Sequence, residues 1–152
     1  MSQEGKDVEG RIGYTVKRLQ MSLRSAGDGV LRPLGLTMPQ YAALSAVARH
    51  PGLNNSDLAR LCFVTRQTMN ELLAGLHRAE LVTRADHPRD RRVRQIELSA
   101  TGRDVLERAD RLVGAVEQRM TAGLDATERR ELLELLKTCA ESLEIHQALS
   151  PG

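Results

Sequence analysis

The stretch "VTRQTMNELLAGLHRAELVTRADHPRDRRVRQIELSATG", residues 64–102, changes its periodicity halfway along. Apolar residues in its first half recur at helical spacing: Met69, Leu72, Leu73 and Leu76. With Thr65 as an N-cap, this spacing predicts a helix over residues 66–79. The second half contains two strand-like segments, residues 81–85 and 93–99, on either side of an arginine-rich run. The stretch therefore predicts a helix followed by a β-hairpin with a cationic tip.

Helices are also predicted on both sides of this stretch. Apolar residues recur at steps of three and four over residues 8–34, with a bend expected near Gly27 and Gly29. Four further segments have helical patterns or capping residues: 38–49, 54–61, 101–122 and 126–148. The sequence thus predicts a mainly α-helical fold with one small β-hairpin.

The composition favours a single helical domain. A chain of 152 residues is too short for two independently folded halves, and a core with no Trp, one Phe and two Tyr must be aliphatic. No apolar run is long enough to span a membrane, and no secretory signal precedes the two distant cysteines. These features predict a cytoplasmic protein in which Cys62 and Cys139 are reduced and buried as small apolar side chains.

Positive charge is concentrated in the middle of the chain. Residues 54–94 contain eight Lys or Arg and five Asp or Glu, a balance of +3, whereas residues 104–152 contain six and ten, a balance of −4. Two short helices followed by a hairpin with a cationic tip form a winged helix-turn-helix. The second helix of such a unit fits the major groove of B-DNA, while arginines on the hairpin reach the minor groove or the phosphates. We therefore expect the middle of the chain to bind double-stranded DNA.

The residues from Leu36 to Gly102 resemble the MarR family of bacterial transcription regulators. The most specific element is the join of strand, wing and returning strand, seen here as "LVTRADHPRDRRVRQIELSATG". The resemblance implies one domain, 1–152, in which residues 1–35 and 101–152 form dimerisation helices around a DNA-binding lobe at residues 36–100. It also implies a homodimer on pseudopalindromic DNA, released by a small aromatic or phenolic effector or by an oxidant.

The predicted recognition helix and wing carry the expected DNA contacts. The resemblance implies that the recognition helix contacts bases in the major groove through Arg66, Gln67, Thr68 and Asn70. It implies that the wing contacts DNA through Arg89, Arg91 and Arg92. Arginine can read guanine with two hydrogen bonds, and glutamine or asparagine can read adenine in the same way. Asp90 is expected to orient a wing arginine. Glu71 is an acidic residue beside the DNA face, and pairing with a neighbouring arginine is its expected role.

The resemblance also implies an effector pocket where the first, second and fifth helices meet. Six residues of the first two helices are candidates to line it: Met21, Arg24, Ser25, Tyr41, Ser45 and Arg49. Either Arg24 or Arg49 would suit a carboxylate. The sequence has no tight His, Cys, Asp or Glu spacing for a metal and no motif of a catalytic site, so neither a cofactor nor an enzyme is expected.

The sequence thus predicts a dimeric, sequence-specific transcription regulator that acts as a ligand-responsive repressor. Two alternatives remain open at this point. One is a winged helix that binds an acidic protein partner without reading DNA. The other is a regulator that senses oxidants through a cysteine such as Cys62. A preference for one inverted repeat over random duplex would separate a regulator from an interaction module.

Overall fold

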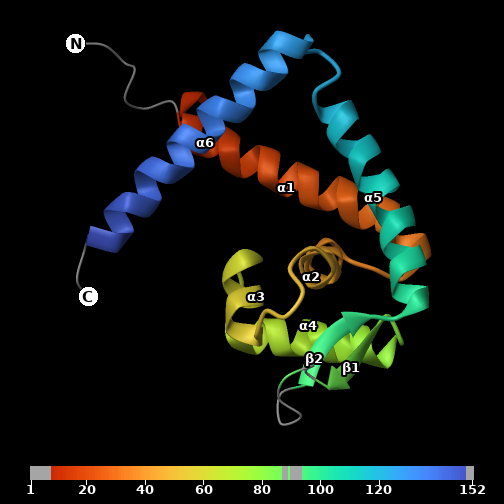
Figure 1. The fold of residues 1–152 in the computed structure, drawn as a ribbon. Coiled ribbons are helices and arrows are strands. Elements are labelled where there is room, and N and C mark those ends of the chain that lie inside the picture. Colours follow the sequence, from red (N-terminus) through yellow and green to blue (C-terminus); the bar gives the residue numbers. More distant parts are fainter. Residues whose placement is uncertain (1–7, 87–88, 90–93, 150–152) are drawn as a thin grey trace, which may run out of the picture. The chain divides into compact units, whose positions relative to one another are not determined.

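A computed structural model describes residues 8–86, 89 and 94–149 of the chain (Figure 1). Its helices are α1 Ile12–Leu31, α2 Met38–Arg49, α3 Asn55–Leu61, α4 Arg66–Arg78, α5 Ala100–Met120 and α6 Ala126–Leu149, with short 3-10 turns η2 Val8–Gly10 and η3 Arg32–Leu34. Strands β1 Val82–Asp86 and β2 Arg94–Leu98 pair in antiparallel register. The predicted fold class, mainly helical with one hairpin, is confirmed. Within the described ranges, no helix is long and apolar enough to cross a membrane.

The chain divides into two compact units, residues 1–116 and 117–152, and each is described by itself. In the first unit, α1 runs unbroken through Gly27 and Gly29, where a bend was expected. The chain turns instead at η3, which contains Pro33. Gly27 serves close packing, because a Cβ at this position would collide with the Met38 side chain. The Asp28 carboxylate also accepts a hydrogen bond from the Met38 amide at 2.7 Å, which ties α1 to the start of α2.

Side-chain caps begin the three helices that follow. Thr37 and Gln40 form a capping box, in which the Gln40 side chain accepts from the Thr37 amide at 2.9 Å. The Asn54 side chain accepts from the Asp57 amide at the start of α3. The predicted cap at Thr65 is also present. These caps satisfy amides that the helices cannot satisfy themselves, which explains why the three helices start where the sequence predicts.

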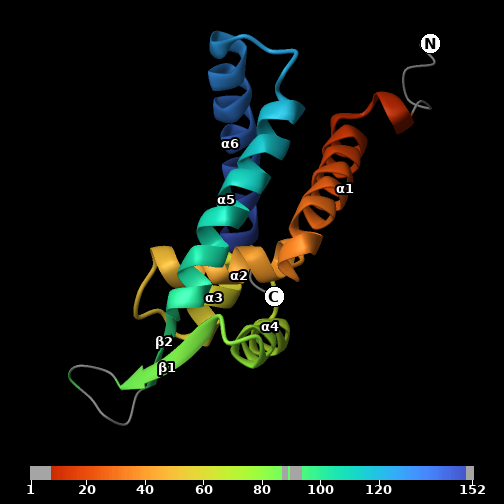
Figure 2. The same ribbon diagram turned by 90° about the vertical axis from the view of Figure 1, so that its right-hand side faces the viewer.

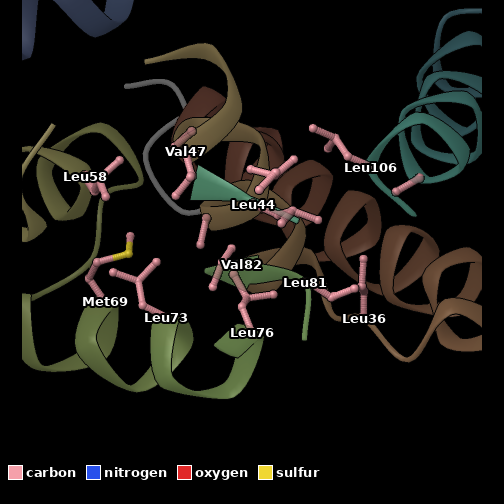
Figure 3. Close-up of a cluster of buried hydrophobic side chains, with 14 of the residues drawn as sticks. Leu36, Leu44, Val47, Leu58, Met69, Leu73, Leu76, Leu81, Val82 and Leu106 are labelled. Carbon is pink, nitrogen blue, oxygen red and sulfur yellow. The ribbon is translucent and has the colours of Figure 1, made fainter. Parts of the chain in front are cut away.

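The core of the first unit lies between the end of α1, helices α2, α3 and α4, the hairpin and the beginning of α5 (Figure 3). Its largest fully buried side chains are Leu31, Leu44, Leu58, Met69 and Leu76. Burial of each contributes about 1.5–3 kcal/mol relative to an exposed side chain. The core is aliphatic, as the composition predicts.

The hairpin is joined firmly to the helices at its base. The Ser99 hydroxyl donates to the Glu80 carbonyl at 2.7 Å and accepts from the Gly102 amide at 2.9 Å, so it caps α5 and holds the end of the turn after α4. Gly102 allows α5 to approach β1 closely, because a Cβ there would overlap the Leu81 carbonyl group. Val82 pairs with Leu98, and both are buried. The base of the wing is therefore part of the core.

The second unit consists mainly of α6, which starts with a reciprocal cap between Asp125 and Glu128. None of its side chains from Ala126 to Glu144 is buried. The prediction that Cys139 is buried is wrong for the single chain, where this residue is exposed. Four leucines of α6 are also exposed: Leu133, Leu135, Leu136 and Leu143. Among the described residues, the apolar side chains of this helix are thus at least partly exposed in the single chain.

Candidate nucleic-acid interface

Helices α3 and α4 form a helix-turn-helix joined by residues 62–65. The α3 helix ends with the Val64 amide bonded to the Ala59 carbonyl at 3.0 Å, and Phe63 between them has a φ of 56°. A left-handed residue of this kind closes a helix, although a residue with a Cβ pays roughly 1–2 kcal/mol for the conformation. The tight turn places the start of α4 directly after α3. No glycine marks this turn in the sequence.

The α4 helix separates apolar from polar side chains as the sequence predicts. Met69, Leu73 and Leu76 are buried in the core, whereas Arg66, Gln67 and Asn70 are exposed near the N-terminal end. The Thr65 hydroxyl accepts from the Thr68 amide at 3.1 Å. The helix therefore presents three predicted base-reading side chains together on one exposed surface.

Two of the predicted readers already have partners within the chain. The Thr68 hydroxyl accepts from the Thr65 hydroxyl at 3.0 Å, so it belongs to the cap as well as to the helix surface. The Asn70 carbonyl oxygen accepts from the side-chain nitrogen of Asn55 at 2.6 Å. Glu71 is exposed, and among the described residues it forms no ion pair with an arginine, contrary to expectation. The Asn55 contact could not be foreseen from periodicity, because it joins two helices.

The hairpin extends away from α2, α3 and α4 (Figure 2). Arg89 is exposed, as expected of a wing contact. Arg91 and Arg92, together with Asp90, lie outside the described residues. The strands that lead to this part of the wing carry Arg84 opposite Ile96 in the pairing register. Among the described wing residues, Arg84 and Arg89 are thus both exposed.

The six predicted effector residues fall into two separate cavities. Tyr41, Ser45 and Arg49 line a cavity of about 370 Å³ between α2 and the end of α3. Met21, Arg24 and Ser25 line another, of about 420 Å³, along α1. The first cavity continues over residues that the sequence did not suggest: Ala42, Ala46, His50, Leu61, Cys62 and Phe63. Within one chain, the structure does not unite the six residues in one pocket.

Asp110 of α5 connects two residues of the first cavity. The Tyr41 hydroxyl donates to Asp110 at 2.6 Å, and Arg49 Nη2 lies 3.3 and 3.4 Å from the two carboxylate oxygens. Burial first, and then the hydrogen bond to Asp110 and its negative charge, together raise the pKa of Tyr41 to about 12. Arg49 acts in the opposite direction. The neutral tyrosine is therefore the stable form, and it fastens α2 to α5.

Cys62 is half-buried at the edge of the same cavity, so its predicted burial is only partial. Burial raises the pKa of its thiol, which disfavours the reactive thiolate. This environment argues against the cysteine-based sensor considered from the sequence. Within the described part of the chain, no group of three His, Cys, Asp or Glu could hold a metal ion.

Known proteins share both the sequence and this fold. A sequence profile of the MarR family matches residues 34–93. The HTH-type transcriptional repressor Rv2887 of Mycobacterium tuberculosis is 36% identical over 126 residues, which cover 83% of this chain and 91% of the repressor.

Solved structures extend the likeness to the fold. The Rv2887 complex with salicylic acid has a TM-score of 0.72 and 34% identity, covering 87% of this chain and 98% of that one. The repressor CouR of Rhodococcus jostii RHA1, bound to a 23-mer DNA duplex, has a TM-score of 0.79 and 29% identity, covering 92% and 99%. On this sequence similarity and this fold, the chain belongs to the MarR family and is a DNA-binding transcription regulator.

Proposed function

We propose that this regulator is a repressor that binds a pseudopalindromic operator as a homodimer and releases it when an aromatic carboxylate binds. The observation that carries the proposal is the α4 surface, where Arg66, Gln67 and Asn70 are exposed above a fully buried apolar face. An exposed, capped helix of this kind can enter a major groove without losing core contacts. Its likeness to CouR, which was solved on a DNA duplex, supports the same use.

Exposed apolar side chains of the single chain support the proposed homodimer. Residues of α1 as well as α6 are exposed and apolar, among them Ile12, Val16, Leu135 and Leu143. A second copy of the chain would bury such stripes, and a twofold dimer would offer two recognition helices to one inverted repeat. We expect the half-site centres to be about 10 base pairs apart, one turn of B-DNA.

We assign the effector to the cavity beside α2. It holds about 370 Å³ and combines apolar walls with Arg49. A volume of this order suits a small aromatic molecule. The two contacts of Arg49 with Asp110 are long, at 3.3 and 3.4 Å, so a carboxylate in the cavity can compete for the guanidinium. The relative Rv2887, solved with salicylic acid, supports an aromatic acid as the class of effector.

The DNA-binding proposal is tested by titrating the operator and a scrambled duplex at several salt concentrations. Replacing Arg66 or Gln67 by alanine is expected to cost about 1–3 kcal/mol at one base pair of each half-site. Replacing Arg91 or Arg92 is expected to weaken binding to all sequences and to reduce the salt slope by about one per lost phosphate contact.

Arg129→Ala on α6 is the matched control, since it removes an exposed arginine outside the lobe. It should leave both the salt slope and the base preference unchanged. If the wild-type protein selects no duplex from genomic DNA, the operator proposal is wrong and the interaction module is favoured. Salt-insensitive binding that Arg91→Ala and Arg92→Ala do not change would contradict the role of the wing.

The effector proposal is tested with salicylate as the probe. Arg49→Gln should abolish the salicylate-dependent loss of operator binding, whereas Arg24→Gln, in the other cavity, should retain it. Calorimetry on the free proteins would check that the loss of response is a loss of salicylate binding. The opposite pattern would move the effector to the α1 cavity. Absence of any salicylate response in the wild type would reject this class of effector.

A further inference from the structure

The hydrogen bond between Asn55 and Asn70 joins the first residue of α3 to the exposed face of α4. The Asn55 amide nitrogen donates to the Asn70 carbonyl oxygen at 2.6 Å. Asn55 is half-buried, and its neighbour Asn54 caps the helix, so the donor stands at a fixed place in the lobe. Asn70 is exposed on the same surface as Arg66 and Gln67. A side chain expected to read a base is thus oriented by a second side chain before DNA arrives.

This contact orients the Asn70 amide, with its oxygen toward Asn55. A free asparagine can read adenine with two bonds, since its oxygen accepts from N6 and its nitrogen donates to N7. Here the oxygen is engaged by Asn55, while the Asn70 nitrogen has no hydrogen-bond partner among the described residues. The amide therefore offers its two N–H donors outward. Its natural partners on a base edge are acceptors such as guanine O6 and N7 or thymine O4.

We propose that Asn55 is a positioning residue that sets the base preference of Asn70, so that Asn70 donates to guanine or thymine instead of reading adenine with two bonds. This inference rests on the proposed operator binding. Closing the interface on DNA removes water from the pair and strengthens the Asn55–Asn70 bond, so turning the Asn70 amide alone, which would set its nitrogen against the Asn55 nitrogen, becomes costly. Asn55 thereby controls specificity without touching the base itself.

The test measures the base preference of the wild-type dimer and its variants on a set of operators with every single base-pair change in the half-site. Asn55→Asp replaces the donor by an acceptor, so Asn70 must turn its nitrogen toward residue 55 and present its oxygen to DNA. The expected result is a change at one base pair, from guanine or thymine toward adenine or cytosine, whose amino groups are donors. Asn55→Ala frees the amide and should reduce discrimination at that base pair about fivefold.

Asn54→Asp is the matched control. It adds the same negative charge one residue earlier and keeps a good N-cap, but it does not contact Asn70. It should weaken binding to all operators equally and leave the preference unchanged. Thermal unfolding of the three variants would check that each lobe is folded.

The outcomes separate this inference from the function on which it rests. If the wild type selects an operator but Asn55→Asp has the same base preferences as Asn54→Asp, the positioning role of Asn55 is wrong and operator binding stands. A wild type that selects no duplex would overturn operator binding, and the role of Asn55 with it. The variant Asn70→Ala identifies the base pair at which Asn70 contributes to discrimination. If the wild type prefers adenine at that base pair, the proposed orientation, with the Asn70 N–H groups facing DNA, is wrong.

Discussion

The winged-helix lobe and helix α6 use apolar residues in opposite ways. In the lobe, Leu44, Met69 and Leu76 are completely buried within the chain. In α6, Leu135 and Leu143 are 65% and 69% exposed, and the helix has none of its described side chains buried. Leucines therefore form a self-contained core in one region and a surface in the other.

This difference shows that helical periodicity alone does not identify a core. Periodicity identifies the apolar face of a helix. It does not tell whether the surface that packs against this face belongs to the same chain or to another copy. Folding of the lobe should depend on its internal packing. The stability of α6 should instead depend on association, and thus on protein concentration.

The largest expected effect comes from placing charge on α6. The double change Leu135→Lys and Leu143→Lys should convert the dimer to a monomer and abolish operator binding, because lysine would be buried unpaired in the interface. The lobe should remain folded, since neither leucine is buried within the chain. Analytical ultracentrifugation would measure the mass, and circular dichroism would measure the remaining helix.

The matched change in the lobe is Leu44→Ala, which should lower the free energy of unfolding by about 2–5 kcal/mol without itself altering the dimer interface. If the wild-type protein is monomeric at micromolar concentration, the proposed dimer interface on α6 is wrong. The same conclusion follows if the double lysine variant is still dimeric.

A smaller effect is expected from Gly102→Ala at the junction of the lobe and α5. The new Cβ would overlap the Leu81 carbonyl group, whose carbon lies at 2.9 Å, and backbone cannot move aside as a flexible side chain does. We expect a loss of about 3 kcal/mol in the free energy of unfolding by denaturant. Gly114→Ala in the same helix, where no atom lies within 4 Å, should instead stabilise by about 1 kcal/mol. Equal effects of the two changes would refute the close approach.

The smallest expected effect concerns the tyrosine that fastens α2 to α5. In a Tyr14→Phe background, Tyr41 is the one remaining tyrosine, and its ultraviolet absorbance should titrate with a pKa of about 12. Because the folded pKa lies above the ordinary value of 10.0, this group stabilises the fold fully below pH 10, and the contribution is lost as the pH rises to about 12. Asp110→Asn should lower the pKa of Tyr41, whereas Glu107→Gln should not change it. An unchanged pKa in Asp110→Asn would show that Asp110 has no part in the shift.

The helices and the hairpin were predictable from sequence because capping residues and periodicity are local. Thr37 and Thr65 mark helix starts by the same side-chain bonds that the structure contains. The α4 surface was predictable for the same reason, since Met69 and Leu76 fix its buried side. The sequence predicts a bend near Gly27, but it does not predict the close approach of Gly27 to Met38, because that contact joins two helices.

The features that were not predictable depend on contacts between distant residues. Asp110 lies 69 residues from Tyr41, and no local pattern connects them. The division of the effector residues into two cavities depends on helix packing, which periodicity does not specify. Cys139 lies on an apolar stripe, and the stripe could not reveal that this residue is exposed in the single chain.

The bonds of Ser99 limit how far an operator can vary in length. Its hydroxyl and amide hold the Glu80 and Leu81 carbonyls, at 2.7 and 3.0 Å, so the end of α4, the base of the wing and the start of α5 meet at one residue. We therefore expect the helix and the base of the wing to approach DNA together. Inserting one base pair between the positions contacted by α4 and by the wing would rotate one set of positions by about 34° around the duplex relative to the other. Because α4 and the base of the wing are joined at Ser99, we expect that they could not then make both sets of contacts.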